Sequence, residues 1–202
     1  MRMTQRYEAV VVGTSAGGSA VLARLLPRFP AAYPWPLIIV QHLHPLQESA
    51  AIILYNDRCA LIIKEAELSE RIRPGYAYFA PPNYHLLIED DRTFALSTGA
   101  RVNYMRPAID VLFESAVDAY GPHLIGVILT GGNHDGAAGL RRIHESGGLT
   151  VVQAPETAEV AAMPRAAIAA TAVDHVLPPD QIAALLVEMA DVPQEAGGSD
   201  AK

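Results

Sequence analysis

The chain of 202 residues has very few cysteines and no cluster of basic residues. Its single cysteine, Cys59, cannot form a disulfide within the chain, so a disulfide-stapled scaffold is excluded. The net charge is −7, with 15 Lys and Arg against 22 Asp and Glu. This acidic balance argues against a nucleic-acid backbone as the main partner.

Long hydrophobic runs are also missing. No apolar stretch is long enough to cross a bilayer, and residues 1–8 are too polar for a secretory signal. We therefore expect a cytoplasmic protein with no direct membrane insertion.

The chain nevertheless contains enough apolar material for a core, because half of its residues are hydrophobic. Its length fits a single domain. We predict one domain over residues 1–191, followed by a small, polar and disordered tail over residues 192–202.

Short apolar runs alternate with amphipathic stretches along most of the chain. The apolar runs predict strands at residues 8–14, 37–40, 61–64, 125–129, 150–152 and 175–177. The amphipathic stretches predict helices at residues 17–28, 47–57, 107–120, 164–170 and 180–189, with another that ends near residue 146. This alternation predicts an α/β fold in three layers, a doubly wound, mainly parallel sheet covered by helices on both faces.

Residues 76–97 break this pattern. Three short apolar runs are separated there by Pro81-Pro82-Asn83 and by Asp90-Asp91. Closely spaced strands with turn residues between them predict a small antiparallel β meander inserted in the α/β chain.

A glycine-rich turn follows the first predicted strand. Gly13 and Gly17 flank Ser15 in the G-x-S-x-G pattern of a nucleophile elbow, and a helix begins directly afterwards. The N-terminus of that helix would offer free N–H groups and partial positive charge to a developing oxyanion. The same turn could instead bind a phosphate or serve only as a tight connection, although it lacks the spacing of a P-loop or a dinucleotide fingerprint.

Two other strand ends carry residues capable of chemistry. The strand at 37–40 is followed by His42 and His44, and the strand at 125–129 leads to His134 and Asp135. In parallel sheets, functional residues gather at the carboxyl ends of the strands. We therefore expect these loops to meet at the Ser15 turn.

Acyl transfer by a serine needs a base, a residue that orients the base, and donors for the oxyanion. Ser15, His42 and Asp135 can fill the nucleophile, base and orienting roles, and Gly131 and Gly132 can offer unhindered backbone N–H groups. A simpler hypothesis is that His42 caps its strand and Asp135 caps the next helix.

Two further arrangements use some of the same residues. His42, His44 and Asp135 could bind a metal, although no H-E-x-x-H or cysteine cluster supports this. The order of an α/β-hydrolase would give Ser15, Asp135 and His175, but its nucleophile normally follows several strands rather than the first.

Six separated motifs, taken together, are specific to one family. They are the V-V-x-G-x-S-x-G-G turn ending at Gly18, Q-H-x-x-P at Gln41–Pro45, A-P-x-x-x-H-L at Ala80–Leu86, V-N-x-x-R-P-x-x-D-x-L-F at Val102–Phe113, I-L-T-G-x-x-x-D-G-A-A-G-L at Ile128–Leu140 and M-P-x-x-A at Met163–Ala167. Through these motifs the chain resembles the catalytic domain of the chemotaxis-receptor methylesterases (CheB).

The resemblance implies a Rossmann-like sheet and an enzyme that hydrolyses glutamate γ-methyl esters on receptor signalling helices. Some members also deamidate receptor glutamines. It implies Ser15 as nucleophile, His42 as base, Asp135 as the residue that orients His42, and the backbone of Gly132 as an oxyanion donor. No cofactor and no metal are implied.

The chain departs from the family pattern at three points. We expect no receiver domain of the usual kind in this chain, and we expect any receiver or kinase protein to act in trans. Ala16 replaces a common Thr after the nucleophile, and Gly132 replaces a common Met, which could loosen the oxyanion hole. These changes keep open a receptor-binding module of the same fold with weak or no turnover.

One cation is a candidate for substrate binding. Arg106 lies in an irregular loop just before a predicted helix, where it could face an acidic partner helix. The alternative is a surface arginine paired with a nearby acid. The partner is expected to be a methylated chemoreceptor or a similar sensory protein.

Overall fold

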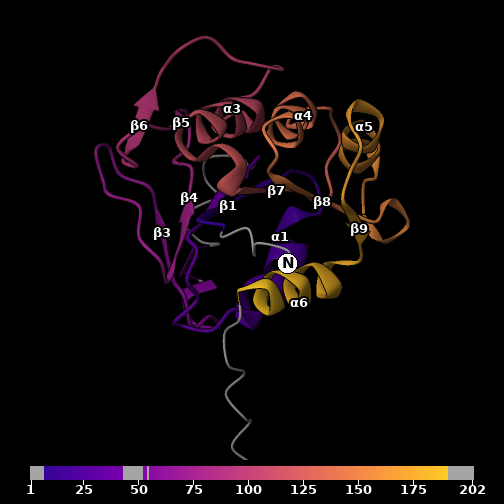
Figure 1. The fold of residues 1–202 in the computed structure, drawn as a ribbon, viewed down its shortest axis with the longest axis horizontal. Helices are drawn as coiled ribbons and strands as arrows, with labels where there is room; N and C mark the ends of the chain where they lie inside the picture. The colour runs from indigo at the N-terminus through magenta and orange to yellow at the C-terminus, as the bar shows by residue number, and fades with distance from the viewer. Residues whose placement is uncertain (1–6, 43–51, 54, 191–202) are drawn as a thin grey trace, which may run out of the picture.

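A parallel sheet of seven strands forms the centre of the protein, seen in a computed structural model that describes residues 7–42, 52–53 and 55–190 (Figure 1). The strands are β1 (Ala9–Thr14), β2 (Leu37–Gln41), β3 (Ile62–Glu65), β4 (Tyr76–Phe79), β7 (Leu124–Ile128), β8 (Leu149–Gln153) and β9 (His175–Leu177). Their order across the sheet is β3-β4-β2-β1-β7-β8-β9, and every neighbouring pair is parallel.

Helices cover both faces of this sheet. On one face lie α1 (Gly18–Leu25), which continues into the 3-10 turn η1 (Leu26–Arg28), and α6 (Pro179–Met189). On the other face lie α3 (Ile109–Tyr120), α4 (Ala137–Glu145) and α5 (Ala162–Ala170), with two further 3-10 turns at η2 (Gly121–His123) and η3 (Pro155–Thr157). The predicted three-layer, doubly wound α/β fold is confirmed.

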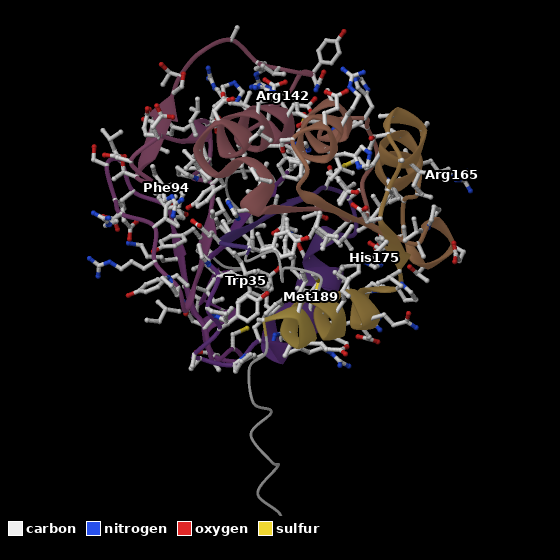
Figure 2. The ribbon with its side chains drawn as sticks, in the orientation of Figure 1. Trp35, Phe94, Arg142, Arg165, His175 and Met189 are labelled. Atoms are coloured by element: carbon white, nitrogen blue, oxygen red, sulfur yellow. The ribbon has the colours of Figure 1, made fainter. Side chains whose placement is uncertain are left out.

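The alternation of side chains along β1 explains why two cores form. Val10 and Val12 point into the core beneath α1 and α6, while Val11 points into the core beneath α3, α4 and α5. All three valines are buried, as expected for a strand covered on both faces. Figure 2 marks one residue from each core, Trp35 in the first and Phe94 in the second.

The central strands define the position of the site. From β1 the chain moves to β2 on one side of it, and later returns through β7 on the other side. The order of the strands therefore changes direction at β1, and in open α/β sheets the crevice for ligands lies at the carboxyl ends beside such a point. The loops after β1, β2 and β7 meet there.

The predicted meander at residues 76–97 is only partly correct. Within the described residues, β5 (His85–Ile88) and β6 (Phe94–Ser97) form an antiparallel hairpin of two strands. Tyr76–Phe79 instead lies in the main sheet as β4, parallel to both β2 and β3. Its continuous apolar run suits a strand with neighbours on both sides, and Pro81-Pro82 then leads the chain away from the sheet.

Some predictions fall on residues outside the described ranges. The start of the predicted helix at 47–57, the loop residue His44 and the predicted tail at 192–202 are among them. The one-domain extent over residues 1–191 stays a prediction. Among the described helices, none combines the length and the hydropathy needed to span a bilayer.

Candidate active site

Ser15 and His42 are neighbours at the carboxyl ends of β1 and β2. Thr14 pairs with Gln41 in the parallel register, and the His42 N–H donates to the Thr14 carbonyl at 3.0 Å. On the other side, the Ser15 N–H donates to the Thr130 carbonyl, which follows β7, at 2.9 Å. The turn therefore holds Ser15 between the two loops that the sequence predicted to meet it.

Small residues allow the close approach around Ser15. Gly17 has a φ of 79°, a left-handed conformation that side chains other than glycine rarely adopt, and the Gly18 N–H donates to the Ser15 carbonyl at 2.8 Å. A Cβ atom on Gly131 would lie 2.9 Å from the Cβ of Ser15 and would also collide with the Met163 side chain. Glycine at position 131 is thus required sterically.

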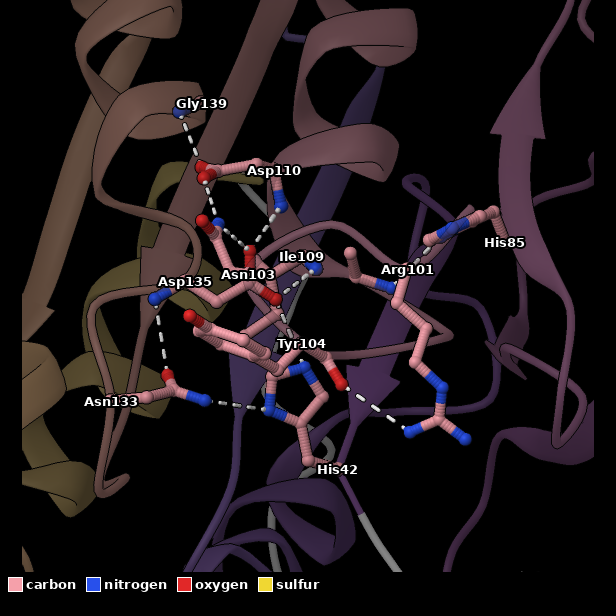
Figure 3. A network of polar contacts seen from close by, with 11 residues as sticks. His42, His85, Arg101, Asn103, Tyr104, Ile109, Asp110, Asn133, Asp135 and Gly139 are labelled. Atoms are coloured by element: carbon pink, nitrogen blue, oxygen red, sulfur yellow. Dashed lines mark hydrogen bonds and ion pairs between the residues drawn. The ribbon is translucent and has the colours of Figure 1, made fainter. Parts of the chain in front are cut away.

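His42 and Asp135 form a buried pair. The Nε2 atom of His42 lies 3.0 Å from Oδ2 of Asp135, and their side chains are 2% and 0% exposed. The two atoms are within ion-pair distance, although the ring N–H is not aligned well enough to count as a directed hydrogen bond. The other ring nitrogen, Nδ1, faces the amide of Asn133 at 3.5 Å (Figure 3).

The Asp135 carboxylate also caps helix α3. It accepts hydrogen bonds from the backbone N–H of Ile109 at 2.7 Å and of Asp110 at 3.1 Å, and from Nδ2 of Asn103 at 2.9 Å. Because α3 has no side-chain cap of its own, Asp135 satisfies two of its first N–H groups from across the site. The alternative hypothesis expected Asp135 to cap α4, the helix that follows it. Asp135 instead caps α3, the helix that precedes it.

These hydrogen bonds set the charge of Asp135. Burial by itself raises the pKa of this carboxyl, but the contacts from His42, Asn103 and the two N–H groups of α3 outweigh burial. The net effect lowers the pKa of Asp135 from its ordinary value of 3.8. The carboxylate is therefore held ionised, as a residue that orients a histidine requires.

Asp110 repeats this arrangement in the opposite direction. It stands in the first turn of α3, and its Oδ1 accepts the Gly139 N–H of α4 at 2.8 Å. Asn103 joins the two carboxylates, because its Nδ2 also donates to Oδ2 of Asp110 at 2.8 Å (Figure 3). Burial raises the pKa of Asp110, and the nearby charge of Asp135 acts in the same direction.

Threonine and glutamine side chains fasten the three loops together. Oγ1 of Thr14 donates to the Thr130 carbonyl at 3.0 Å, and Oγ1 of Thr130 donates to the Ala16 carbonyl at 2.9 Å. The Thr130 N–H donates to Oε1 of Gln153, at the end of β8, at 2.9 Å. These contacts fix the Ser15 turn against the ends of β7 and β8.

Gly132, the predicted oxyanion donor, lies on the exposed side of the same loop. The N–H of its neighbour Gly131 donates to the carbonyl of Val160, in the loop before α5. The carbonyl of Gly131 accepts the N–H of Met163, in α5 itself. Among the described residues, the N–H of Gly132 has no acceptor, so it can serve a substrate oxygen.

Arg106, the predicted substrate-facing cation, points its Nη1 group at two carbonyls. It donates to Thr98 and to Gly99 at 2.8 Å each, across the loop that connects β6 to α3. The structure therefore does not place Arg106 directly in the cluster around His42. It also does not show the acidic partner of the alternative hypothesis.

The sequence analysis assigned no role to Asn103, Asp110 or Asn133. Asn103 and Asp110 both lie in the V-N-x-x-R-P-x-x-D motif. The available signal was an acid among the apolar residues that begin the helix at 107–120. Asn133 had no such signal, because its contact depends on how the loop after β7 folds over β2.

The two other arrangements find little support. His175 begins β9, the edge strand, which is separated from β1 by β7 and β8, so it lies to the side of the Ser15 turn; Figure 2 labels it. Of the metal set, His44 lies outside the described ranges, and the described residues contain no cluster of three or more metal-ligating side chains.

The fold defines the class of this protein as a doubly wound α/β domain. Its polar cluster lies at the carboxyl ends of β1, β2 and β7, where the strand order changes direction. The family is specified by similarity to known proteins. The sequence model of the CheB methylesterase family matches residues 10–186, and the chain belongs to this family.

Named relatives and a solved structure agree with that assignment. A Leptospira interrogans protein, a candidate protein-glutamate methylesterase/protein-glutamine glutaminase, is 52% identical over 183 residues, which cover 91% of this chain and 95% of the relative. The protein-glutamate methylesterase FrzG of Myxococcus xanthus is 38% identical over 187 residues, 92% of this chain and 56% of the relative. The crystal structure of the Thermotoga maritima CheB methylesterase catalytic domain matches with a TM-score of 0.87 and 33% identity, covering 91% of this chain and 98% of that one.

Proposed function

We propose that this chain is a serine hydrolase that removes methyl groups from glutamate γ-methyl esters on the signalling helices of a receptor. Ser15 is the nucleophile, His42 the general base and Asp135 the residue that orients His42. The same acyl-enzyme chemistry extends to deamidation of glutamine, since only the leaving group differs. Relatives named as protein-glutamate methylesterases and protein-glutamine glutaminases support this substrate class.

The observation that carries the proposal is the buried His42–Asp135 pair beside the Ser15 turn. An ionised aspartate 3.0 Å from one ring nitrogen favours a proton on that nitrogen and leaves the other nitrogen basic. A base of this kind, next to a serine in a nucleophile elbow, is the arrangement that acyl transfer requires.

The proposed reaction uses these residues in turn. Ser15 Oγ attacks the γ-carbonyl while His42 takes its proton. The N–H of Gly132, together with the N-terminus of α1, stabilises the oxyanion. His42 returns the proton to methanol, and then activates the water that releases glutamate from the acyl-enzyme.

The partner we propose is a methylated chemoreceptor or a similar sensory protein. Arg106 stays our predicted contact to its acidic helices, while its Nη1 group holds the loop carbonyls. A receiver or kinase protein acting in trans is the proposed source of regulation. No cofactor is needed for the chemistry.

The proposal is tested by measuring methanol release from a methylated receptor cytoplasmic fragment. We expect the wild type to release methanol and Ser15→Ala to lose several powers of ten in kcat, by analogy with other triads. Ser19→Ala is the matched control, because Ser19 lies four residues further on in the first turn of α1, is exposed, and uses its Oγ to accept a hydrogen bond from Gln41. It should retain most of the activity.

Two outcomes would contradict the proposal. Equal release by wild type and Ser15→Ala would move the chemistry to another group. Binding of the fragment without release by either protein would identify a receptor-binding module instead.

A further inference from the structure

Asn133 contacts both members of the buried pair. This residue lies in the loop between β7 and α4 and is partly buried. Its Oδ1 accepts the backbone N–H of Asp135 at 3.1 Å, and its Nδ2 faces Nδ1 of His42 at 3.5 Å (Figure 3). The Asn133 side chain thus connects the backbone of Asp135 to Nδ1 of His42, the ring nitrogen that does not face the Asp135 carboxylate.

The orientation of the Asn133 amide is determined by its partners. A backbone N–H can only donate, so the atom that faces Asp135 N–H must be the amide oxygen. The NH₂ group must then face His42. Because an NH₂ group also only donates, it requires a lone pair on Nδ1.

The other side of the imidazole ring requires the same tautomer. Nε2 lies 3.0 Å from a carboxylate oxygen, a distance at which Nε2 must carry the proton to avoid repulsion between lone pairs. Asp135 and Asn133 therefore both specify a neutral ring with its proton on Nε2. Nδ1 then keeps its single lone pair, so it is the nitrogen that can take up the proton of Ser15 when the 3.5 Å contact with the Asn133 NH₂ group gives way.

We propose that Asn133 is a positioning residue, which holds the Nε2-protonated ring of His42 in place and opposes protonation of Nδ1 until substrate arrives. This inference deepens the proposed function and rests on it. Once Nδ1 gains a proton, it no longer offers a lone pair to the Asn133 NH₂ group, and the contact becomes repulsive. Asn133 thus favours the neutral base over the imidazolium, which also favours return of the proton to the leaving group.

The charged groups around His42 influence its protonation independently of the Asn133 NH₂ contact. Asp135 is in contact with the ring and favours the imidazolium, and Asp110 lies behind it through the shared Asn103. Glu159 lies on the far side of the turn, next to Gly17. Asn133 is neutral, so it changes the protonation of His42 only through its oriented NH₂ group.

The test is an NMR titration of His42 in the full chain with labelled histidine, assigned by comparison with His42→Gln. Loss of one hydrogen bond to the neutral ring in Asn133→Ala should raise the His42 pKa by about 0.5–1 unit. Asn133→Asp keeps an oxygen for the Asp135 N–H but places a carboxylate beside Nδ1, so its increase should be larger, about 1 unit or more. In methanol release, the acidic limb of kcat/KM should move to higher pH in the same order.

His134→Ala is the matched control, because His134 is the exposed neighbour of Asn133 in the same loop. It should leave the His42 pKa and the ring tautomer unchanged. An unchanged His42 pKa and ¹⁵N tautomer signature in folded Asn133→Asp would overturn the inference. The titration needs no turnover, so this result is distinguishable from failure of the esterase proposal, which Ser15→Ala tests.

Discussion

A single side chain, Asp135, connects the proposed chemistry of this protein to its stability. Its carboxylate lies beside His42 and at the same time accepts the first two N–H groups of α3. Replacement of this residue therefore removes the proposed orienting group and an observed helix cap together. Its low pKa records both roles, because each contact favours the charged form.

Asp135→Asn should lower kcat by about four powers of ten, because the amide favours the wrong histidine tautomer. It should also lower the free energy of unfolding by about 2–4 kcal/mol at neutral pH, since hydrogen bonds to a buried charge are lost. The pKa of Asp135 in the folded protein is below its ordinary value of 3.8. The stability that the Asp135 carboxylate contributes is therefore fully present above pH 3.8, and it is lost as the pH falls through the folded pKa. Urea denaturation of both proteins from pH 7 to pH 3 checks this.

The stability difference between wild type and Asp135→Asn should accordingly be constant near neutrality and become smaller below about pH 4. A difference that grew on acidification would mean that the contacts do not favour the carboxylate. Retained turnover in the variant would remove Asp135 from the mechanism.

Two adjacent glycines at the turn after β7 have opposite steric environments. A Cβ on Gly132 would have Val160 Cγ1 as its nearest neighbour at 3.9 Å, whereas a Cβ on Gly131 would collide with Met163 and Ser15. The backbone of Gly132 is not among those with positive φ. A side chain at position 132 is therefore compatible with the fold.

We expect Gly132→Ala to raise stability by about 0.4–1 kcal/mol, because it restricts the unfolded chain without strain in the folded one. A stiffer backbone at the proposed oxyanion donor should also keep or raise kcat for methanol release. Gly131→Ala is the matched control and should lose both stability and activity. Loss of activity in Gly132→Ala without loss of stability would argue that the loop must remain flexible.

At the scale of elements, helices α3 and α4 cap each other. Asp135, just before α4, accepts N–H groups of α3, and Asp110 of α3 accepts an N–H group of α4. Asn103 bridges the two carboxylates with one NH₂ group. The two carboxylates are thus kept close together by one shared donor, the NH₂ group of Asn103, and by backbone N–H groups that each serve one of them.

Asn103→Ala should loosen the starts of both helices. Two hydrogen bonds to carboxylates are lost, so the free energy of unfolding should fall by about 2–3 kcal/mol, and kcat should fall as well because Asp135 is held less firmly. Hydrogen exchange at the first turns of α3 and α4 should become faster. Both measurements can be made on the same protein sample.

Asn56→Ala is a suitable comparison, because Asn56 makes two hydrogen bonds to the Ile63 backbone far from His42. It should cost stability without lowering kcat. If Asn103→Ala behaved in the same way, Asn103 would be a structural residue only.

At the scale of the whole molecule, the sequence predicted the sheet, its two covered faces and the three loops that meet at Ser15. Those features depend on local hydrophobic pattern and on the general rule for carboxyl ends of parallel strands. The pairing of β4 with β2 and β3 was not predicted, because strand partners are chosen by contacts distant in sequence. The capping of α3 by Asp135 and the contact of Asn133 with His42 were missed for the same reason.

The only tryptophan of the chain lies at the opposite end of the sheet from the candidate site. Trp35 precedes β2, is 7% exposed, and packs edge-on against Tyr7 and Tyr33. Its intrinsic fluorescence therefore reports whether the amino ends of the strands are packed, and a ligand at the carboxyl ends should leave the emission nearly unchanged. The protein thus carries a built-in optical probe of global folding that is insensitive to docking at Ser15.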